Sequence, residues 1–115
     1  MTFGIYIRQK REELKSFSSK FSLRKIAGII GVEPAFLSKV EREIVPPPSE
    51  AKIIALAYAL DEDPDYLLGL AGKVSKELSN IIVKRPILFA ELIRQLDSSS
   101  DEIIQALINQ ISHNN

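Results

Sequence analysis

The chain has 115 residues, of which 45% are hydrophobic and 26% are charged, and it contains no cysteine. This length allows one compact domain, or one small domain with an appendage. The lack of cysteine excludes disulfides and thiolate metal sites and suits a reducing cytoplasm. The formal net charge is zero, which taken alone argues against a nucleic-acid partner.

The distribution of charge along the chain points the other way. Residues 1–45 carry nine lysines and arginines against five acidic residues, a net charge of +4. Residues 46–115 carry six against ten, a net charge of −4. A locally basic segment attracts phosphate, although many solvated surfaces reach a similar imbalance.

Neither a targeting signal nor a membrane segment is expected. Met1–Gly4 leads directly into a charged helix, unlike a signal peptide. No apolar run approaches the roughly 18 residues that a membrane span needs. We therefore expect a cytoplasmic protein.

The first predicted helix runs from Phe3 to about Leu14, with Phe3, Ile7 and Leu14 on its apolar side. A serine-rich loop, Lys15–Phe21, follows, and Ser22 is a favourable N-cap for the next helix.

The segment Ser22–Arg42 has the pattern of a helix-turn-helix. Ala27 is small where two helices would cross, and Gly31 tolerates the positive φ of a helix end. Pro34 suits the first turn of the second helix. The apolar positions share one face: Ile26, Ile30, Val32, Leu37 and Val40. The alternative is an ordinary helical hairpin, but the agreement of all these positions in register favours the helix-turn-helix.

Two further helices complete a predicted five-helix domain, residues 1–71. Pro46–Pro48 enforces an extended connection. Ser49 then caps a fourth helix, whose core positions are Ile53, Leu56, Ala57 and Leu60. Asp63–Asp65 opens a fifth helix, with Tyr66, Leu67 and Leu70 expected to be buried.

Residues 72–115 predict an extension of two to three amphipathic helices, so the expected fold class is all-α. Pro86 ends one helical segment and is a plausible first residue of the next. The sequence Asp97–Ser100 is a break with a cap before the last helix.

This pattern resembles the λ-repressor-like, Cro/cI-type (XRE) family of helix-turn-helix regulators. The resemblance covers about Phe3 to Leu70 and rests on four segments together: Ile7–Arg11, Ser22–Arg42, Pro46–Ser49 and Asp63–Leu68. It implies that the third helix, about Pro34–Arg42, lies in the major groove of double-stranded DNA and that dimers bind two half-sites.

The resemblance also implies specific contacts. Base edges would be contacted by Pro34, Ala35, Ser38 and Lys39. The DNA backbone would be contacted by Ser22, Arg24, Lys25 and Arg42. By their chemistry, Lys39 can donate to guanine, Ser38 to several acceptors, and Ala35 can offer only a methyl group to thymine.

Some positions are expected to be structural, and others depart from the pattern of the family. Arg11 and Glu41 resemble an internal ion pair of the family and are read as structural. Glu33-Pro34-Ala35 replaces polar donors that relatives usually present, and Glu43-Ile44-Val45 replaces a loop that is commonly basic. These departures lower the expected affinity and base discrimination, and a weak monomer would depend on dimerisation.

The apolar positions of the extension are predicted to dimerise the chain, as regulators of this class need a twofold partner. They are Leu92, Leu96, Ile103, Ile104, Leu107, Ile108 and Ile111. Two alternatives stay open: packing onto the fourth and fifth helices of the same chain, and binding a different protein.

Catalysis has little support in the sequence, and no cofactor or metal is expected. The only histidine, His113, lies in a polar tail, and no phosphate-binding glycine loop occurs. The main hypothesis is a dimeric sequence-specific DNA-binding regulator, a repressor rather than an enzyme. The alternative is an interaction module or antitoxin of the same fold that binds a toxin or metallopeptidase.

Overall fold

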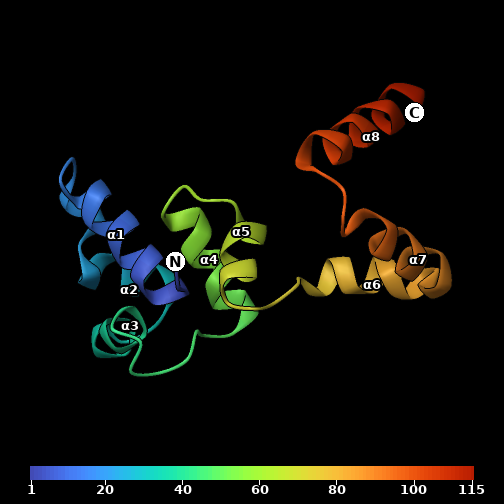
Figure 1. Ribbon diagram of the computed structural model, residues 1–115. Coiled ribbons are helices and arrows are strands. Elements are labelled where there is room, and N and C mark those ends of the chain that lie inside the picture. The colour runs from blue at the N-terminus through green and yellow to red at the C-terminus, as the bar shows by residue number, and fades with distance from the viewer. The chain divides into compact units, whose positions relative to one another are not determined.

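The protein is all-α, as the sequence predicts (Figure 1). The computed structural model describes all residues, Met1–Asn115, and contains no strand. The elements are α1 (Phe3–Lys15), the short 3-10 helix η1 (Ser19–Phe21), α2 (Leu23–Ile30), α3 (Pro34–Glu41), α4 (Glu50–Ala59), α5 (Pro64–Leu70), α6 (Lys76–Lys84), α7 (Pro86–Leu96) and α8 (Asp101–Asn114).

The chain divides into two compact units, Met1–Ser75 and Lys76–Asn115. The sequence placed this division after residue 71. The structure extends the first unit because Lys73 remains attached to it: its backbone N–H donates to the Leu68 carbonyl, and its Nζ lies 3.1 Å from the Pro48 carbonyl oxygen. Ser75 is buried as well.

The first unit has one hydrophobic core to which helices α1 to α5 all contribute. Its buried members are Phe3, Ile7, Ile26, Ala27, Ile30, Leu37, Val40, Ile53, Leu56, Ala57, Leu60, Leu67 and Leu68. The expected burial of α5 was partly wrong: Leu68 is buried, Leu70 is only partly buried, and Tyr66 is exposed. Tyr66 instead stacks edge-on against Tyr6, with ring centroids 5.2 Å apart.

Four helices of this unit end in the same left-handed turn. The residue with positive φ is Gly31 after α2, Glu43 after α3, Asp61 after α4 and Gly72 after α5. After α3, for example, the Ile44 N–H donates to the Lys39 carbonyl and the Glu43 N–H to the Val40 carbonyl. These paired bonds satisfy carbonyls that a helix end leaves unpaired, so each helix stops at a defined residue.

Helix α1 approaches the end of α3 very closely. A Cβ added at Gly4 would lie 2.4 Å from the Val40 carbonyl oxygen, so only glycine fits there. Further along α1, Arg11 forms two hydrogen bonds with Glu41: Nε to Oε2 at 2.7 Å and Nη2 to Oε1 at 2.9 Å. Both side chains are buried. The ion pair expected from the sequence therefore joins α1 to α3.

A second polar contact joins α1 to the connection between α4 and α5. The Tyr6 hydroxyl donates a short hydrogen bond to the Glu62 carboxylate. This hydrogen bond raises the pKa of Tyr6 to about 12 and lowers the pKa of Glu62. The hydrogen bond needs a neutral Tyr6 and an ionised Glu62. It is therefore lost at acid pH, where Glu62 becomes protonated, and at alkaline pH, where Tyr6 ionises.

In the second unit, α6 packs against α7, and none of its residues from Lys76 to Asn115 is buried. Its helices have 9, 11 and 14 residues, lengths at which an isolated helix is marginal in water. None of the helices in the chain is both long and apolar enough to cross a membrane.

Replacing Arg11 by Met should destabilise the first unit by about 3–5 kcal/mol, because Glu41 would keep a buried charge without its partner. Replacing both residues, as Arg11→Met with Glu41→Leu, should recover most of that loss, since no buried charge remains. Urea denaturation followed by circular dichroism measures both. If the double variant is as unstable as the single one, packing rather than the ion pair accounts for the effect.

The phenolate absorbance of the folded chain should show a step near pH 12 that belongs to Tyr6. A raised pKa in the folded state means that the stabilisation is present below pH 10 and is lost as the pH rises toward 12. Tyr6→Phe should remove this step, and Glu62→Gln should move it toward the ordinary value of 10. An unchanged titration in Glu62→Gln would contradict the assigned cause.

Candidate nucleic-acid interface

Helix α3 has one buried face and one solvent-facing face. Leu37, Val40 and Glu41 are buried against the rest of the unit. The opposite face carries residues at i, i+3, i+4 and i+7, a spacing that places them on one side of a helix. Of these, Ala35, Lys39 and Arg42 are exposed and Ser38 is partly buried. The structure thus brings three of the four predicted base contacts together with Arg42, a predicted backbone contact.

The start of α3 is poor in hydrogen-bond donors. Pro34 is the first helical residue and has no N–H, and Ala35 carries only a methyl group. Glu33 occupies the N-cap position, but its side chain makes no capping hydrogen bond. Its exposed carboxylate is therefore free to face a neighbouring molecule, and it would repel a phosphate.

The start of α2 offers donors and positive charge. The Ser22 hydroxyl accepts a hydrogen bond from the Lys25 backbone N–H at 3.2 Å and so caps the helix. The N–H groups of Leu23 and Arg24, which precede the first helical hydrogen bond, remain directed outward. The side chains of Arg24 and Lys25 are exposed. A helix N-terminus with two cations beside it favours phosphate.

Lys52 on α4 fixes the turn between these two helices. Its Nζ lies 2.9 Å from the Ile30 carbonyl oxygen and 3.3 Å from that of Gly31. The positive charge of Lys52 also interacts favourably with the negative end of the α2 helix dipole. Sequence reasoning missed this residue, because a contact across 21 or 22 residues leaves no local pattern.

Ser38 and Arg42 are joined directly. The Arg42 Nε lies 3.2 Å from the Ser38 hydroxyl oxygen and 3.3 Å from its carbonyl oxygen. The i, i+4 spacing could have suggested this pair. Sequence reasoning instead gave the two residues separate roles on base edges and on the DNA backbone.

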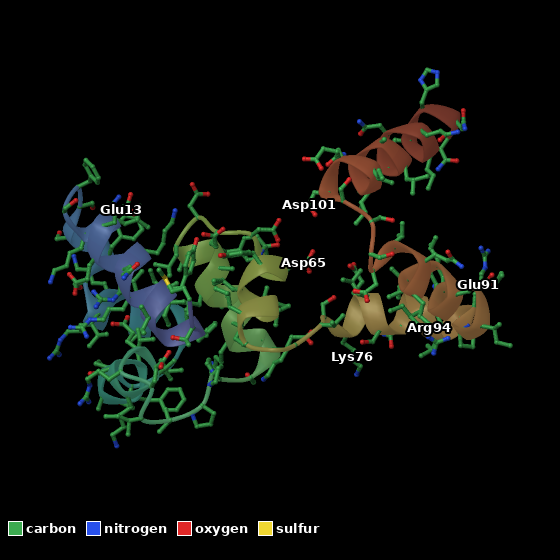
Figure 2. All side chains as sticks on the ribbon, viewed as in Figure 1. Glu13, Asp65, Lys76, Glu91, Arg94 and Asp101 are labelled. Carbon is green, nitrogen blue, oxygen red and sulfur yellow. The ribbon has the colours of Figure 1, made fainter.

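Side-chain nitrogen atoms and side-chain oxygen atoms concentrate on different parts of the first unit. Figure 2 shows side-chain nitrogens gathered around α1, α2 and α3, whereas oxygens are prominent near the start of α5, where Asp65 is labelled. Arg24 and Lys25 on α2, Lys39 on α3 and Arg42 at the end of α3 are all exposed, so these two helices can offer cations to a polyanion.

The residues predicted to dimerise the chain lie on α7 and α8. Leu96 and Ile104 are partly buried, and the others are exposed: Leu92, Ile103, Leu107, Ile108 and Ile111. Helix α8 begins at its expected cap, where the Ser100 hydroxyl accepts from the Ile103 N–H. Large aliphatic side chains left 38–59% exposed on several successive turns are typical of a surface that binds a partner.

No group of three or more histidine, cysteine or acidic residues is placed to hold a metal ion. A cavity of about 360 Å³ lies beside the start of α1; most of its lining residues are apolar, and Glu43 contributes the one carboxylate.

No protein-family model, curated protein or solved structure matches this chain.

Proposed function

We propose that the first unit is a five-helix, λ-repressor-like helix-turn-helix domain and that the chain is a sequence-specific double-stranded DNA-binding regulator. In this proposal α2 and α3 are the two helices of the motif, and α3 enters the major groove. The observation that carries the proposal is the division of α3 into a buried face and a solvent-facing face with Ser38, Lys39 and Arg42. A recognition helix needs both, one to fix it to the domain and one to meet base edges.

The start of α2 supports the same interpretation. Ser22 caps the helix, and Arg24 and Lys25 place two cations beside its free N–H groups. Such an arrangement fits a DNA phosphate, which would fix the orientation of the domain without reading sequence. Binding DNA in this way, the chain acts in the cytoplasm as a repressor rather than as an enzyme.

We also propose that the regulator is a dimer formed through α6 to α8. The unit from Lys76 to Asn115 has no buried residue, although short helices need to bury an apolar face for stability. Four basic and five acidic residues nearly balance in it, so two copies can meet without strong repulsion. Two half-site contacts would then combine into one stronger interaction.

A second function is favoured by a different observation. Glu33 has a free carboxylate, and the first residues of α3, Pro34 and Ala35, carry no side-chain donor, so the helix is poorly equipped to contact bases. Helices α7 and α8, in contrast, expose many large apolar side chains. A protein-interaction module or antitoxin would use that apolar surface to bind a toxin or metallopeptidase. Its DNA binding would be weak or secondary.

The first test is the salt dependence of DNA binding. We expect the logarithm of the affinity to fall linearly with the logarithm of salt between about 50 and 200 mM. Lys25→Ala should reduce this slope by about 1 and weaken binding to all sequences equally. Lys84→Ala removes the same charge outside α2 and α3 and is not one of the apolar residues proposed to dimerise the chain, so it should leave the slope unchanged.

The upstream DNA of the chain's own gene should bind more tightly than random duplex of equal length in the same assay. Equal affinity for both would refute the regulator and favour the interaction module. Fluorescence anisotropy with labelled duplexes gives both affinities under matched salt.

The second test separates self-association from packing within the chain. Light scattering should give twice the 12.9 kDa mass of one chain. Ile104→Asp with Leu107→Asp should give monomers in which the first unit keeps its helices, because two charges cannot be buried in the interface. Gln105→Asp with Asn109→Asp, which adds the same charge on a polar pair of α8, should stay dimeric.

One outcome contradicts the dimer. A mass of 12.9 kDa for the wild-type chain at high concentration excludes it. If the wild-type chain is such a monomer and the Ile104→Asp, Leu107→Asp variant loses helix by circular dichroism, these two side chains pack within their own chain instead.

A further inference from the structure

Arg42 at the end of α3 has one nitrogen held in place and two that are free. Its Nε donates to the hydroxyl and carbonyl oxygens of Ser38, one turn earlier on the helix. Neither Nη1 nor Nη2 takes part in a hydrogen bond or ion pair. Arg42 is exposed, so these two nitrogens face solvent with their N–H donors unused.

The bond to Ser38 determines where the guanidinium group lies. Arg42 follows Ser38 by four residues and Ala35 by seven, so the three lie along one side of α3. An arginine tied back by its Nε is drawn over this side rather than extended beyond the helix end. The free Nη donors are therefore presented on the surface that Lys39 also shares.

The chemistry of this surface favours a base edge as the partner of Arg42. Two parallel N–H donors in a fixed plane match the O6 and N7 acceptors of guanine in the major groove. Pro34 and Ala35 supply no side-chain donor, and the Ser38 hydroxyl, which accepts from Arg42, has a single O–H to donate. Arg42 is thus the only group on this side of α3 that offers two N–H donors in one plane.

We propose that Arg42 reads a guanine and that Ser38 is the residue that positions it, an inference that rests on the proposed DNA-binding function. This reverses the two roles expected from the sequence, in which Ser38 contacts a base and Arg42 the backbone. Holding the guanidinium plane before DNA arrives reduces the conformational freedom lost on binding. Ser38 contributes to specificity through Arg42.

The experiment begins with binding sites selected from random duplexes by the full chain. Each guanine of the selected site is then replaced by 7-deazaguanine, which lacks the N7 acceptor. The wild-type chain should lose about tenfold in affinity at one guanine, the size expected of one good bidentate contact. Arg42→Ala should accept any base at that position and be insensitive to the analogue, and Arg42→Lys, whose ammonium can still donate to guanine but lacks the planar pair of donors, should keep only a weakened preference.

Two sets of variants sharpen the result. Arg8→Lys, the same change at an exposed arginine of α1, should keep the wild-type preference. Ser38→Ala should relax preference at the same base pair as Arg42→Ala, and Ser38→Thr, which keeps the hydroxyl, should restore it. Relaxation at a different base pair would show that Ser38 contacts a base itself, and that overturns its positioning role.

Three outcomes overturn the reading role of Arg42. Uniform weakening across sequences in Arg42→Ala, with the salt slope lowered by about 1, identifies a phosphate contact. Unchanged DNA binding with lower thermal stability identifies a helix cap only. Failure of the wild-type chain to select any sequence refutes the proposed function as well, whereas the first two outcomes leave that function standing.

Discussion

The buried ion pair between Arg11 and Glu41 is the interaction on which the arrangement of the first unit depends. It joins residues 30 positions apart through two hydrogen bonds, and Arg11 Nη1 also donates to the Phe21 carbonyl at 3.3 Å, just before α2. One guanidinium thus connects α1, the end of α3 and the approach to α2. Because Glu41 is fixed inward, Arg42, the next residue along the chain, is directed toward solvent.

The left-handed helix ends supply the second constraint, and they show where sequence reasoning reaches its limit. Gly31 could be predicted, because glycine adopts positive φ at little cost. Glu43 and Asp61 could not, since a residue with a Cβ loses about 1–2 kcal/mol there. Both turns lie at tertiary contacts: the end of α3 and Glu43 pack against Gly4, and the turn at Asp61 places Glu62 beside Tyr6.

The all-α class, the caps at Ser22 and Ser49, and most core positions could be read from periodicity and capping chemistry alone. These depend on residues within one or two turns of each other. The contacts that fix the positions of the helices join residues far apart in the sequence. Lys52 binds the carbonyl of Ile30 at the end of α2, Lys73 binds the carbonyl of Pro48, and neither contact leaves a local sequence pattern. The aromatic Tyr66 was expected inside, yet it lies outside because Tyr6 offers it an edge-on partner at the surface.

Helix α3 offers few hydrogen-bond donors, and α6 to α8 leave apolar side chains exposed. Both features fit a chain that binds DNA as a dimer, as proposed. In the proposed complex with DNA, one domain would make few base contacts, because Pro34 and Ala35 stand at the start of α3, and Glu33 would repel phosphate. A single guanine contact contributes about 1–3 kcal/mol of discrimination, far less than a regulator needs to find one site among many. Joining two domains doubles those contacts and adds the spacing of the half-sites as a further requirement. In this protein, specificity would therefore depend as much on the helices that join two copies as on the helix that meets the bases.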